Sequence, residues 1–248
     1  MSELIMGRNA VLEALKAGRE IEKINIEKNR NRGGSLKQII AKASDAGIPV
    51  YYSDRAYMDK LADGNGASDV NDQGVIALAS DFEYSSPEDI LELAEKRGED
   101  PFILVLDGIE DPHNLGAIIR TAECAGVHGV IIPKRRSASV NETVLRTSAG
   151  AAEYMLCARV TNIGRTIEML QDKGVWVCAC DMGEELMYQR DLTGPLALVI
   201  GSEGFGISRL VKEKCDFVAT VPMKGHVNSL NASNAAAIVM YEALRQRL

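Results

Sequence analysis

The chain has 248 residues, of which 46% are hydrophobic and 25% are charged, as in ordinary globular proteins. This composition excludes a mostly disordered chain, and no apolar run approaches the roughly 18 to 20 residues of a membrane-spanning helix. Glu3, Arg8 and Glu13 interrupt the first apolar stretch, so we expect no signal peptide. The five cysteines contain no Cys-x-x-Cys pair, which favours reduced cytoplasmic thiols over disulfides or a zinc site.

The net charge of −7 is unevenly distributed along the chain. Residues 1–76 are neutral overall, residues 77–112 carry a net charge of −9, and residues 113–248 carry +2. The acidity is therefore confined to one middle segment, and it does not argue against nucleic-acid binding by the flanking parts.

The first 80 residues alternate between helical and strand patterns, which predicts a small α/β domain at residues 1–80. Ser35 is the expected N-cap of one helix, and Gly18 and Gly47 are expected to end two helices. The predicted elements are a helix at 9–15, a strand at 21–26, a helix at 35–46, a strand at 48–52, a helix at 54–61, a polar loop at 64–72 and a strand at 74–79.

Residues 81–101 are polar and acidic, and they hold one short helical pattern that starts near Ser86 or Pro87. We interpret this segment as a charged linker containing one helix. The alternative is a surface helix that belongs to a domain.

After this segment, short apolar runs alternate with helical patterns. Continuous apolar runs are typical of parallel strands that are buried on both faces. We therefore expect an α/β domain with a mostly parallel sheet at residues 102–248. The predicted strands are 102–106, 129–132, 175–179, 196–200 and 217–221, and the predicted helices are 115–125, 163–173, 207–214 and 231–247.

Three polar segments follow predicted strands, where ligands bind in open parallel sheets. The first contains Asn114, which could also be a helix N-cap, and Arg120, which lies in an otherwise apolar helix. A buried arginine must reach an anion or a structural acid, and an exposed one would simply extend to solvent.

The second polar segment, residues 201–206, holds three glycines that would allow a ligand to approach the backbone closely, although a tight turn alone would also explain them. Its spacing does not match the dinucleotide-binding pattern. The third segment, residues 222–234, offers Ser229, Asn231 and Ser233 at the start of a helix, where they could act merely as caps.

Together, the three segments resemble the motifs of the SpoU/TrmH family of RNA 2′-O-methyltransferases, within the SPOUT class. The opening residues 7–12 further resemble the small substrate-binding domain of bacterial members that methylate large-subunit rRNA. The first motif matches Asn114, Gly116, Arg120, Thr121 and Ala122, the second matches Gly201, Glu203, Gly204 and Gly206, and the third matches Pro222, Met223, Gly225, Ser229, Leu230, Asn231 and Ser233.

The resemblance implies a trefoil-knotted α/β domain that binds S-adenosylmethionine and works as a homodimer. It implies that Gly201, Val221 and Leu230 hold this cofactor. The implied catalytic residues are Arg120, Asn114, Glu203, Ser229 and Asn231. Because an arginine has a pKa above about 12, it is a poor base, and binding a phosphate or a developing alkoxide is an easier role for Arg120.

The last predicted helix carries a wide apolar stripe, formed by Ile238, Val239, Tyr241 and Leu244, which favours burial against a partner subunit. Two basic clusters are candidate RNA contacts, although either could be a solvated surface. They are Lys28, Arg30 and Arg32, and Lys134, Arg135 and Arg136.

The resemblance favours a guanosine in the peptidyl-transferase region of 23S rRNA as the target. Two alternatives stay open at this point. One is methylation of tRNA, and the other is a catalytically silent RNA-binding or ribosome-assembly protein on the same fold.

Overall fold

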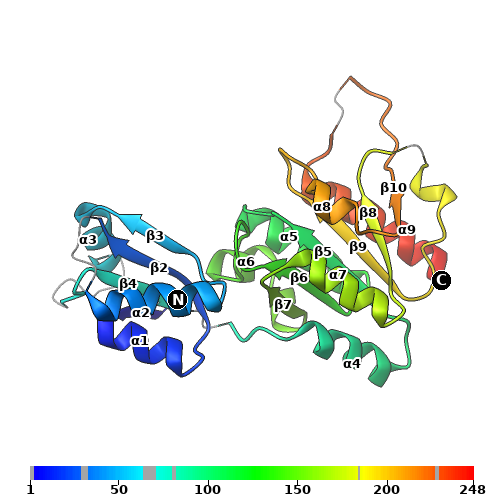
Figure 1. Ribbon diagram of the computed structural model, residues 1–248. Helices are drawn as coiled ribbons and strands as arrows, with labels where there is room; N and C mark the ends of the chain where they lie inside the picture. Colours follow the sequence, from blue (N-terminus) through cyan, green and yellow to red (C-terminus); the bar gives the residue numbers. More distant parts are fainter. Residues whose placement is uncertain (1–2, 29–32, 64–70, 80–81, 184, 227–228) are drawn as a thin grey trace. The chain divides into compact units, whose positions relative to one another are not determined.

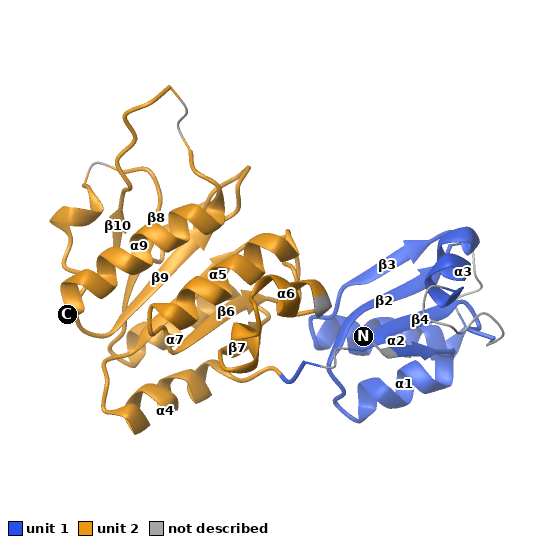
Figure 2. Cartoon of the chain, turned by 180° about the vertical axis from the view of Figure 1, so that it is seen from behind, with its two compact units in different colours: residues 1–83 blue, residues 84–248 orange. Residues whose placement is uncertain are grey.

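The computed structural model describes residues 3–28, 33–63, 71–79, 82–183, 185–226 and 229–248, and the chain divides into the compact units Met1–Glu83 and Tyr84–Leu248 (Figures 1 and 2). All five cysteines are free thiols. Within the described ranges, none of the helices combines the length and the apolar character needed to cross a membrane.

The smaller unit is a four-stranded mixed sheet with helices on both faces. Strand β4 alternates between the faces: Val75 and Ala77 pack toward α1 and α2, and Ile76 packs toward α3. The sheet order is β1 (Glu3–Met6), β4 (Val75–Ala79), β2 (Ile21–Glu27) and β3 (Val50–Ser53), and the helices are α1 (Arg8–Lys16), α2 (Gly34–Asp45) and α3 (Arg55–Asp63). Among the described strands of this unit, β2 and β3 pair in parallel and the other pairs are antiparallel.

The sequence prediction for this unit misses β1 and misplaces one helix cap. Helix α2 begins at Gly34, with Gly33 in the N-cap position and no side-chain cap bond, so Ser35 is not the N-cap. The extended backbone of Gly33 lets the helix start earlier than the serine suggests. Residues 64–70 of the expected polar loop lie outside the described residues.

The larger unit is built on a six-stranded parallel sheet, as the apolar runs predict. Residues Phe102–Leu106 and Leu196–Ile200 of its central strands are buried throughout. The order is β10 (Phe217–Ala219), β8 (Trp176–Cys180), β9 (Leu196–Gly201), β5 (Phe102–Asp107), β6 (Gly129–Pro133) and β7 (Leu156–Val160), and every neighbouring pair is parallel. The prediction misses β7 and α6.

Helices cover both faces of this sheet. On one face, side chains of α4 and α7 pack in one core with strand residues such as Ile103 and Val177. Helices α5 and α9 lie side by side (Figure 2). The helices are α4 (Pro87–Arg97), α5 (Pro112–Cys124), α6 (Glu142–Thr147), α7 (Ile163–Asp172), α8 (Arg209–Lys212) and α9 (Ala232–Arg247).

Helix α4, which we expected inside a linker, packs on the larger unit. Ser86 caps it: the Ser86 hydroxyl accepts from the Asp89 amide at 3.1 Å, and the Asp89 carboxylate accepts from the Ser86 amide at 2.7 Å. Ile90 is fully buried, and a Cβ on Gly129 would lie 2.5 Å from it, so the glycine permits this contact. Residues 87–97 of the expected linker thus form a surface helix of the second unit, and the units divide near residue 83.

Candidate functional site

Residues from the three polar segments meet in one hydrogen-bonded network, which we call the polar triangle: Asn114, Glu203 and Asn231. Asn114 Nδ2 donates to Glu203 Oε1 at 2.7 Å, and Asn231 Nδ2 donates to Asn114 Oδ1 at 3.1 Å. Asn231 Nδ2 also donates to Glu203 Oε1. These pairs are 89, 117 and 28 residues apart in sequence, so the fold itself assembles the triangle.

Asn114 is available for the triangle because another residue caps its helix. Asp111 is the N-cap of α5, and its Oδ1 accepts from the His113 amide at 2.9 Å. Asn114 lies inside the first turn and is buried, with 8% of its surface exposed. The alternative interpretation of Asn114 as the N-cap is therefore wrong.

Asn231 combines capping with membership of the triangle. Its Oδ1 accepts from the Ser233 amide at 3.0 Å and from the Ser233 hydroxyl at 2.6 Å, which caps α9. Its Nδ2 is then left to face Asn114 and Glu203. An asparagine amide supplies donors on one atom and an acceptor on the other, so a single side chain can satisfy both duties.

The loop that carries Glu203 is closed by its own backbone. The Ser202 amide donates to the Gly206 carbonyl at 3.0 Å, and the Gly206 amide donates to the Ser202 carbonyl at 2.9 Å. A Cβ on Gly201 would lie 2.1 Å from the Gly206 carbonyl carbon. We expected Gly201 to make room for a ligand. The structure shows that a glycine is needed at this position because the backbone of the closed loop leaves no space for a side chain.

One pocket, the Leu230 pocket, lies on one side of this loop and has a volume of about 690 Å³. It is lined by all three residues expected to hold the cofactor, and Ser229 lines it as well. These residues are Gly201, Val221 and Leu230.

Part of the Leu230 pocket wall was not predicted from the sequence. Cys180, Asp181 and Met182 line it from the end of β8. The Asp181 carboxylate accepts from Lys212 Nζ at 2.9 Å. A hydrogen bond with Cys178, together with burial, raises the pKa of the Cys180 thiol well above its ordinary value, so this wall contributes a neutral thiol. The one sequence signal for Cys180, Asp181 and Met182 is their position just after a predicted strand.

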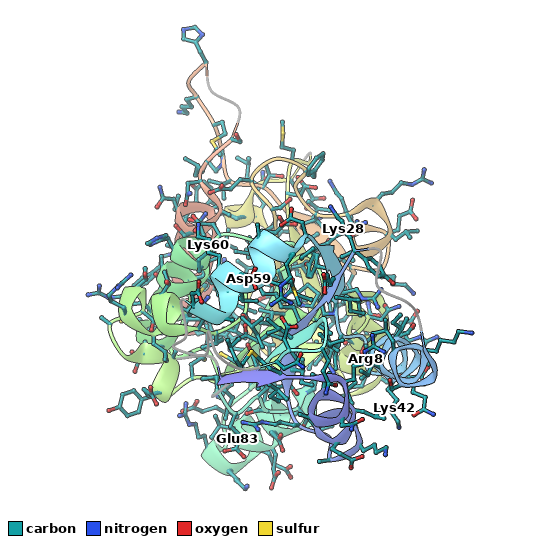
Figure 3. The ribbon with its side chains drawn as sticks, turned by 90° about the vertical axis from the view of Figure 1, so that its left-hand side faces the viewer. Arg8, Lys28, Lys42, Asp59, Lys60 and Glu83 are labelled. Atoms are coloured by element: carbon teal, nitrogen blue, oxygen red, sulfur yellow. The ribbon has the colours of Figure 1, made fainter. Side chains whose placement is uncertain are left out.

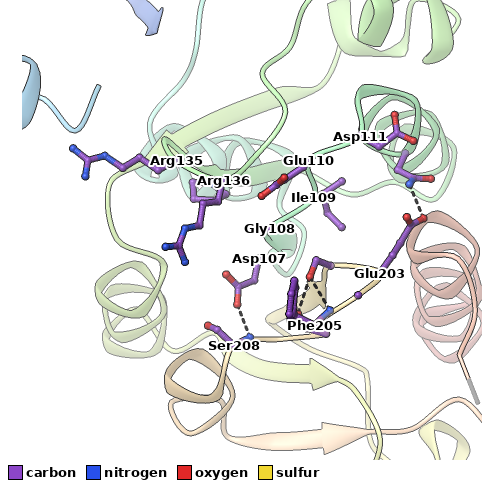
Figure 4. Close-up of a pocket in the computed structure, with 15 residues that line it drawn as sticks. Asp107, Gly108, Ile109, Glu110, Asp111, Arg135, Arg136, Glu203, Phe205 and Ser208 are labelled. Atoms are coloured by element: carbon purple, nitrogen blue, oxygen red, sulfur yellow. Dashed lines mark hydrogen bonds between the residues drawn. The ribbon is translucent and has the colours of Figure 1, made fainter. Parts of the chain in front are cut away.

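A second pocket, the Arg136 pocket, has a volume of about 680 Å³ and shares residues 202–206 with the first (Figure 4). Asn114, Glu203, Arg135 and Arg136 line it, whereas Lys134 is not among the described lining residues. Arg136 has a φ of +55°, a conformation that non-glycine residues adopt at a cost and that clusters at functional sites. Phe205, which the sequence analysis did not select, also lines it.

The structure does not bring Arg120 into the triangle of its own chain. Arg120 follows Asn114 by six residues, which turns it about 240° around the helix axis. Its side chain is exposed, and it is not among the described residues that line either pocket.

The first basic cluster lies in the smaller unit. Lys28 follows the end of β2, its side chain is exposed, and its amide donates to the Ser53 carbonyl at 2.8 Å (Figure 3). Arg30 and Arg32 lie outside the described residues.

Two protein-family models match the chain. The model of the SpoU rRNA Methylase family matches residues 101–241, which is more than half of the chain. The model described as RNA 2′-O ribose methyltransferase substrate binding matches residues 4–85.

Named relatives agree with these matches. YacO of Bacillus subtilis (strain 168), which its name assigns to the TrmH family of tRNA/rRNA methyltransferases, is 45% identical over 246 residues, covering 99% of this chain and 96% of that protein. An AdoMet-bound rRNA methyltransferase from Sinorhizobium meliloti is 25% identical with a TM-score of 0.60, over 100% of this chain and 88% of that one.

A TrmH/SpoU tRNA modifying enzyme of A. aeolicus is 28% identical with a TM-score of 0.55, over 64% of this chain and 81% of that one. The family matches cover both units of the chain, and the motif residues that suggested the family meet in the polar triangle. The chain belongs to the SpoU/TrmH family of RNA 2′-O-ribose methyltransferases.

Proposed function

We propose that the chain transfers a methyl group from S-adenosylmethionine to the ribose 2′-hydroxyl of a guanosine in the peptidyl-transferase region of 23S rRNA. The position of Glu203 carries the proposal, because this member of the polar triangle lines both pockets. A transfer reaction needs its donor and its acceptor held next to each other, with a catalytic group within reach of the reacting hydroxyl. The Leu230 pocket would take the donor, and the Arg136 pocket would take the RNA.

The Leu230 pocket fits S-adenosylmethionine in size and in chemistry. Its volume of about 690 Å³ lies within the usual range of cofactor sites. Apolar side chains such as Ile200 and Leu230 line it beside backbone groups of the glycine loop. The adenine ring could therefore pack against the apolar side chains and form hydrogen bonds with the backbone. Gly201, Val221 and Leu230 would hold the cofactor, which when bound supplies an electrophilic methyl group on a sulfonium.

The polar triangle would orient the reacting ribose. The Glu203 carboxylate accepts two amide hydrogen bonds and also borders the Arg136 pocket, so it is placed to accept a hydrogen bond from the 2′-hydroxyl. Asn114 would hold the ribose beside it. Asn231 joins the loops of two motifs. Ser229, which lines the Leu230 pocket, would help to position the nucleotide.

The remaining predicted catalytic residue, Arg120, would act in the site of a second copy of the chain. Its role would be to bind the RNA phosphate and stabilise the developing alkoxide. Among the described residues, the side chain of Arg120 has no hydrogen-bond or ion-pair partner. On the neighbouring α9, Ile238 and Tyr241 remain 38% and 49% exposed. These features support a homodimer formed through α5 and α9. The trefoil knot that the family resemblance implies at the carboxyl end of the chain would form part of the same interface.

The rest of the RNA would contact basic side chains of both units. Arg135 and Arg136 line the Arg136 pocket beside Glu203, which supports phosphate contacts there. Lys134 would add charge to the same loop. Lys28, Arg30 and Arg32 belong to the unit that the substrate-binding family model matches. The free cysteines support a cytoplasmic setting for this reaction.

Transfer RNA is the second candidate substrate, since the name of the 45% identical relative includes both tRNA and rRNA. The intact triangle disfavours a catalytically silent protein on this fold.

A methyl-transfer assay tests the proposed function directly. The purified chain, given tritiated S-adenosylmethionine and an unmodified transcript of the peptidyl-transferase region, should label one ribose at its 2′ oxygen, mapped by resistance of the neighbouring bond to alkali. Unmodified tRNA is the parallel substrate. Labelling of tRNA alone would select the second candidate, and labelling of neither RNA would contradict the proposed function.

Gly201 and Gly204 form a matched pair for testing the cofactor site. A Cβ on Gly201 would overlap the backbone at Gly206, whereas a Cβ on Gly204 meets no atom within 4 Å. Gly201→Ala should weaken binding of S-adenosylmethionine by about 5- to 150-fold, the scale of an overpacking cost of 1–3 kcal/mol, measured by calorimetry. Gly204→Ala should bind as the unmodified chain does. Equal binding by both variants would mean that the loop does not shape this site.

Mixed dimers test whether Arg120 acts across the subunit interface. Arg120→Ala and Asn114→Ala homodimers should each lose about 100-fold or more in kcat, as expected for a lost transition-state contact. If the arginine comes from the partner, a heterodimer of the two variants keeps one intact site. An equal mixture of subunits, unfolded together and refolded, should then regain about a quarter of the original activity. A mixture as inactive as the homodimers would place Arg120 in its own subunit's site.

A further inference from the structure

Phe205 is 98% exposed at the tip of the loop that divides the two pockets. A single exposed apolar side chain is common on protein surfaces and needs no explanation by itself. Phe205 differs because it lines both the proposed donor pocket and the proposed RNA pocket. In the view of Figure 4 it lies between Asp107 and Glu203.

Hydrogen bonds hold the backbone of the loop that carries this ring. The Phe205 amide donates to the Ser202 hydroxyl at 3.4 Å, and the Ser202–Gly206 backbone pair closes the turn beneath it. Beyond the turn, the Ser208 amide donates to Asp107 Oδ2 at 2.8 Å, and Ile207 is buried in the core. Because the loop backbone is already braced, little backbone entropy is lost when a ligand covers the ring.

The charges around the ring differ between the walls of the Arg136 pocket. Arg135 and Arg136 form one wall, whereas Asp107 is the last residue of β5 and Glu110 lies in the loop that follows it (Figure 4). A phosphate is attracted by the arginines and repelled by the carboxylates. A nucleotide in this pocket would therefore direct its phosphate toward the arginines and leave its uncharged base beside Phe205.

We infer that Phe205 is the stacking platform for the base of the nucleotide whose ribose is methylated. This inference rests on the proposed function and adds the residue that holds the target base. Proteins that read RNA splay bases out and stack them on aromatic rings, and every base has a π-face, so one phenylalanine serves any base. With the base stacked on Phe205, the ribose is brought to the Glu203 side of the same pocket.

The chain contains a natural reference for a fluorescence test, because Trp176 is its only tryptophan. Trp176 is the first residue of β8, at the opposite end of the sheet from the site loops, and it is 62% exposed. In a Trp176→Phe background, Phe205→Trp places an indole on the loop tip. Titration with the unmodified peptidyl-transferase transcript should quench this indole by stacking, while Trp176 in the unmodified chain keeps its emission.

Steady-state kinetics on the same transcript separate stacking from packing. Phe205→Ala should lower kcat/KM by about 5- to 150-fold, the range for losing one stacked base. Phe205→Tyr should keep most of the activity, whereas Phe205→Leu, which keeps apolar volume without a ring, should behave like Phe205→Ala. The dissociation constant of S-adenosylmethionine and the dimer mass should not change. Trp176→Ala is the control for loss of an exposed aromatic side chain.

The outcomes of these experiments test this inference separately from the proposed function on which it rests. If the unmodified chain methylates the transcript and Phe205→Ala does so equally well, the inference is overturned and the function stands. Full rescue by Phe205→Leu, or dissociation of the dimer by Phe205→Ala, would show that the ring packs against protein and would also overturn it. If the unmodified chain methylates neither this transcript nor tRNA, the proposed function is overturned, and so is the inference that rests on it.

Discussion

The hydrogen bonds among Asn114, Glu203 and Asn231 are the constraint on which the rest of the site depends. They join the first turn of α5, the loop after β9 and the start of α9, three segments that lie far apart in the sequence. Two of the bonds end on the Glu203 carboxylate, and hydrogen bonds to a charged group are about twice as strong as neutral ones. With these segments fixed, the two pockets must meet at the Glu203 loop.

The parallel sheet explains why these segments can meet. Strands β5 and β9 are neighbours with all of their residues in register from Phe102 with Leu196 to Asp107 with Gly201, so their following loops start side by side. The loop after β9 is short and closed by its own backbone, which places Glu203 and Phe205 on a rigid support. Catalytic geometry is best held by such rigid elements, because small displacements cost large factors in rate.

Much of this arrangement could be predicted from the sequence, and the residues show why. The continuous apolar runs predicted the buried parallel strands, and the three motifs contained every member of the triangle. Local patterns failed where tertiary contacts decide. Helix α4 looks like a linker because its outer face is acidic, and its contacts with the sheet, such as that of Ile90 with Gly129, show that it belongs to the larger unit. Asn114 looks like a cap until Asp111 is seen to occupy that position.

Other features have no local signal at all. The clash that excludes a side chain at Gly201 involves backbone five residues further on, in a turn that sequence spacing does not specify. Phe205 reads as one apolar residue among glycines, and its importance comes from the two pockets that meet around it. The direction of Arg120 follows from helix geometry once the true start of α5 is known.

The central claim is that the Glu203 carboxylate acts in methyl transfer rather than merely holding the loop. The most direct measurement is single-turnover methyl transfer by Glu203→Gln, which keeps the size of the side chain and removes its charge. The account predicts a rate about 100-fold lower, with the dissociation constant of S-adenosylmethionine within about threefold of that of the unmodified chain. A rate close to that of the unmodified chain, or a loss explained entirely by weaker cofactor binding, would contradict it.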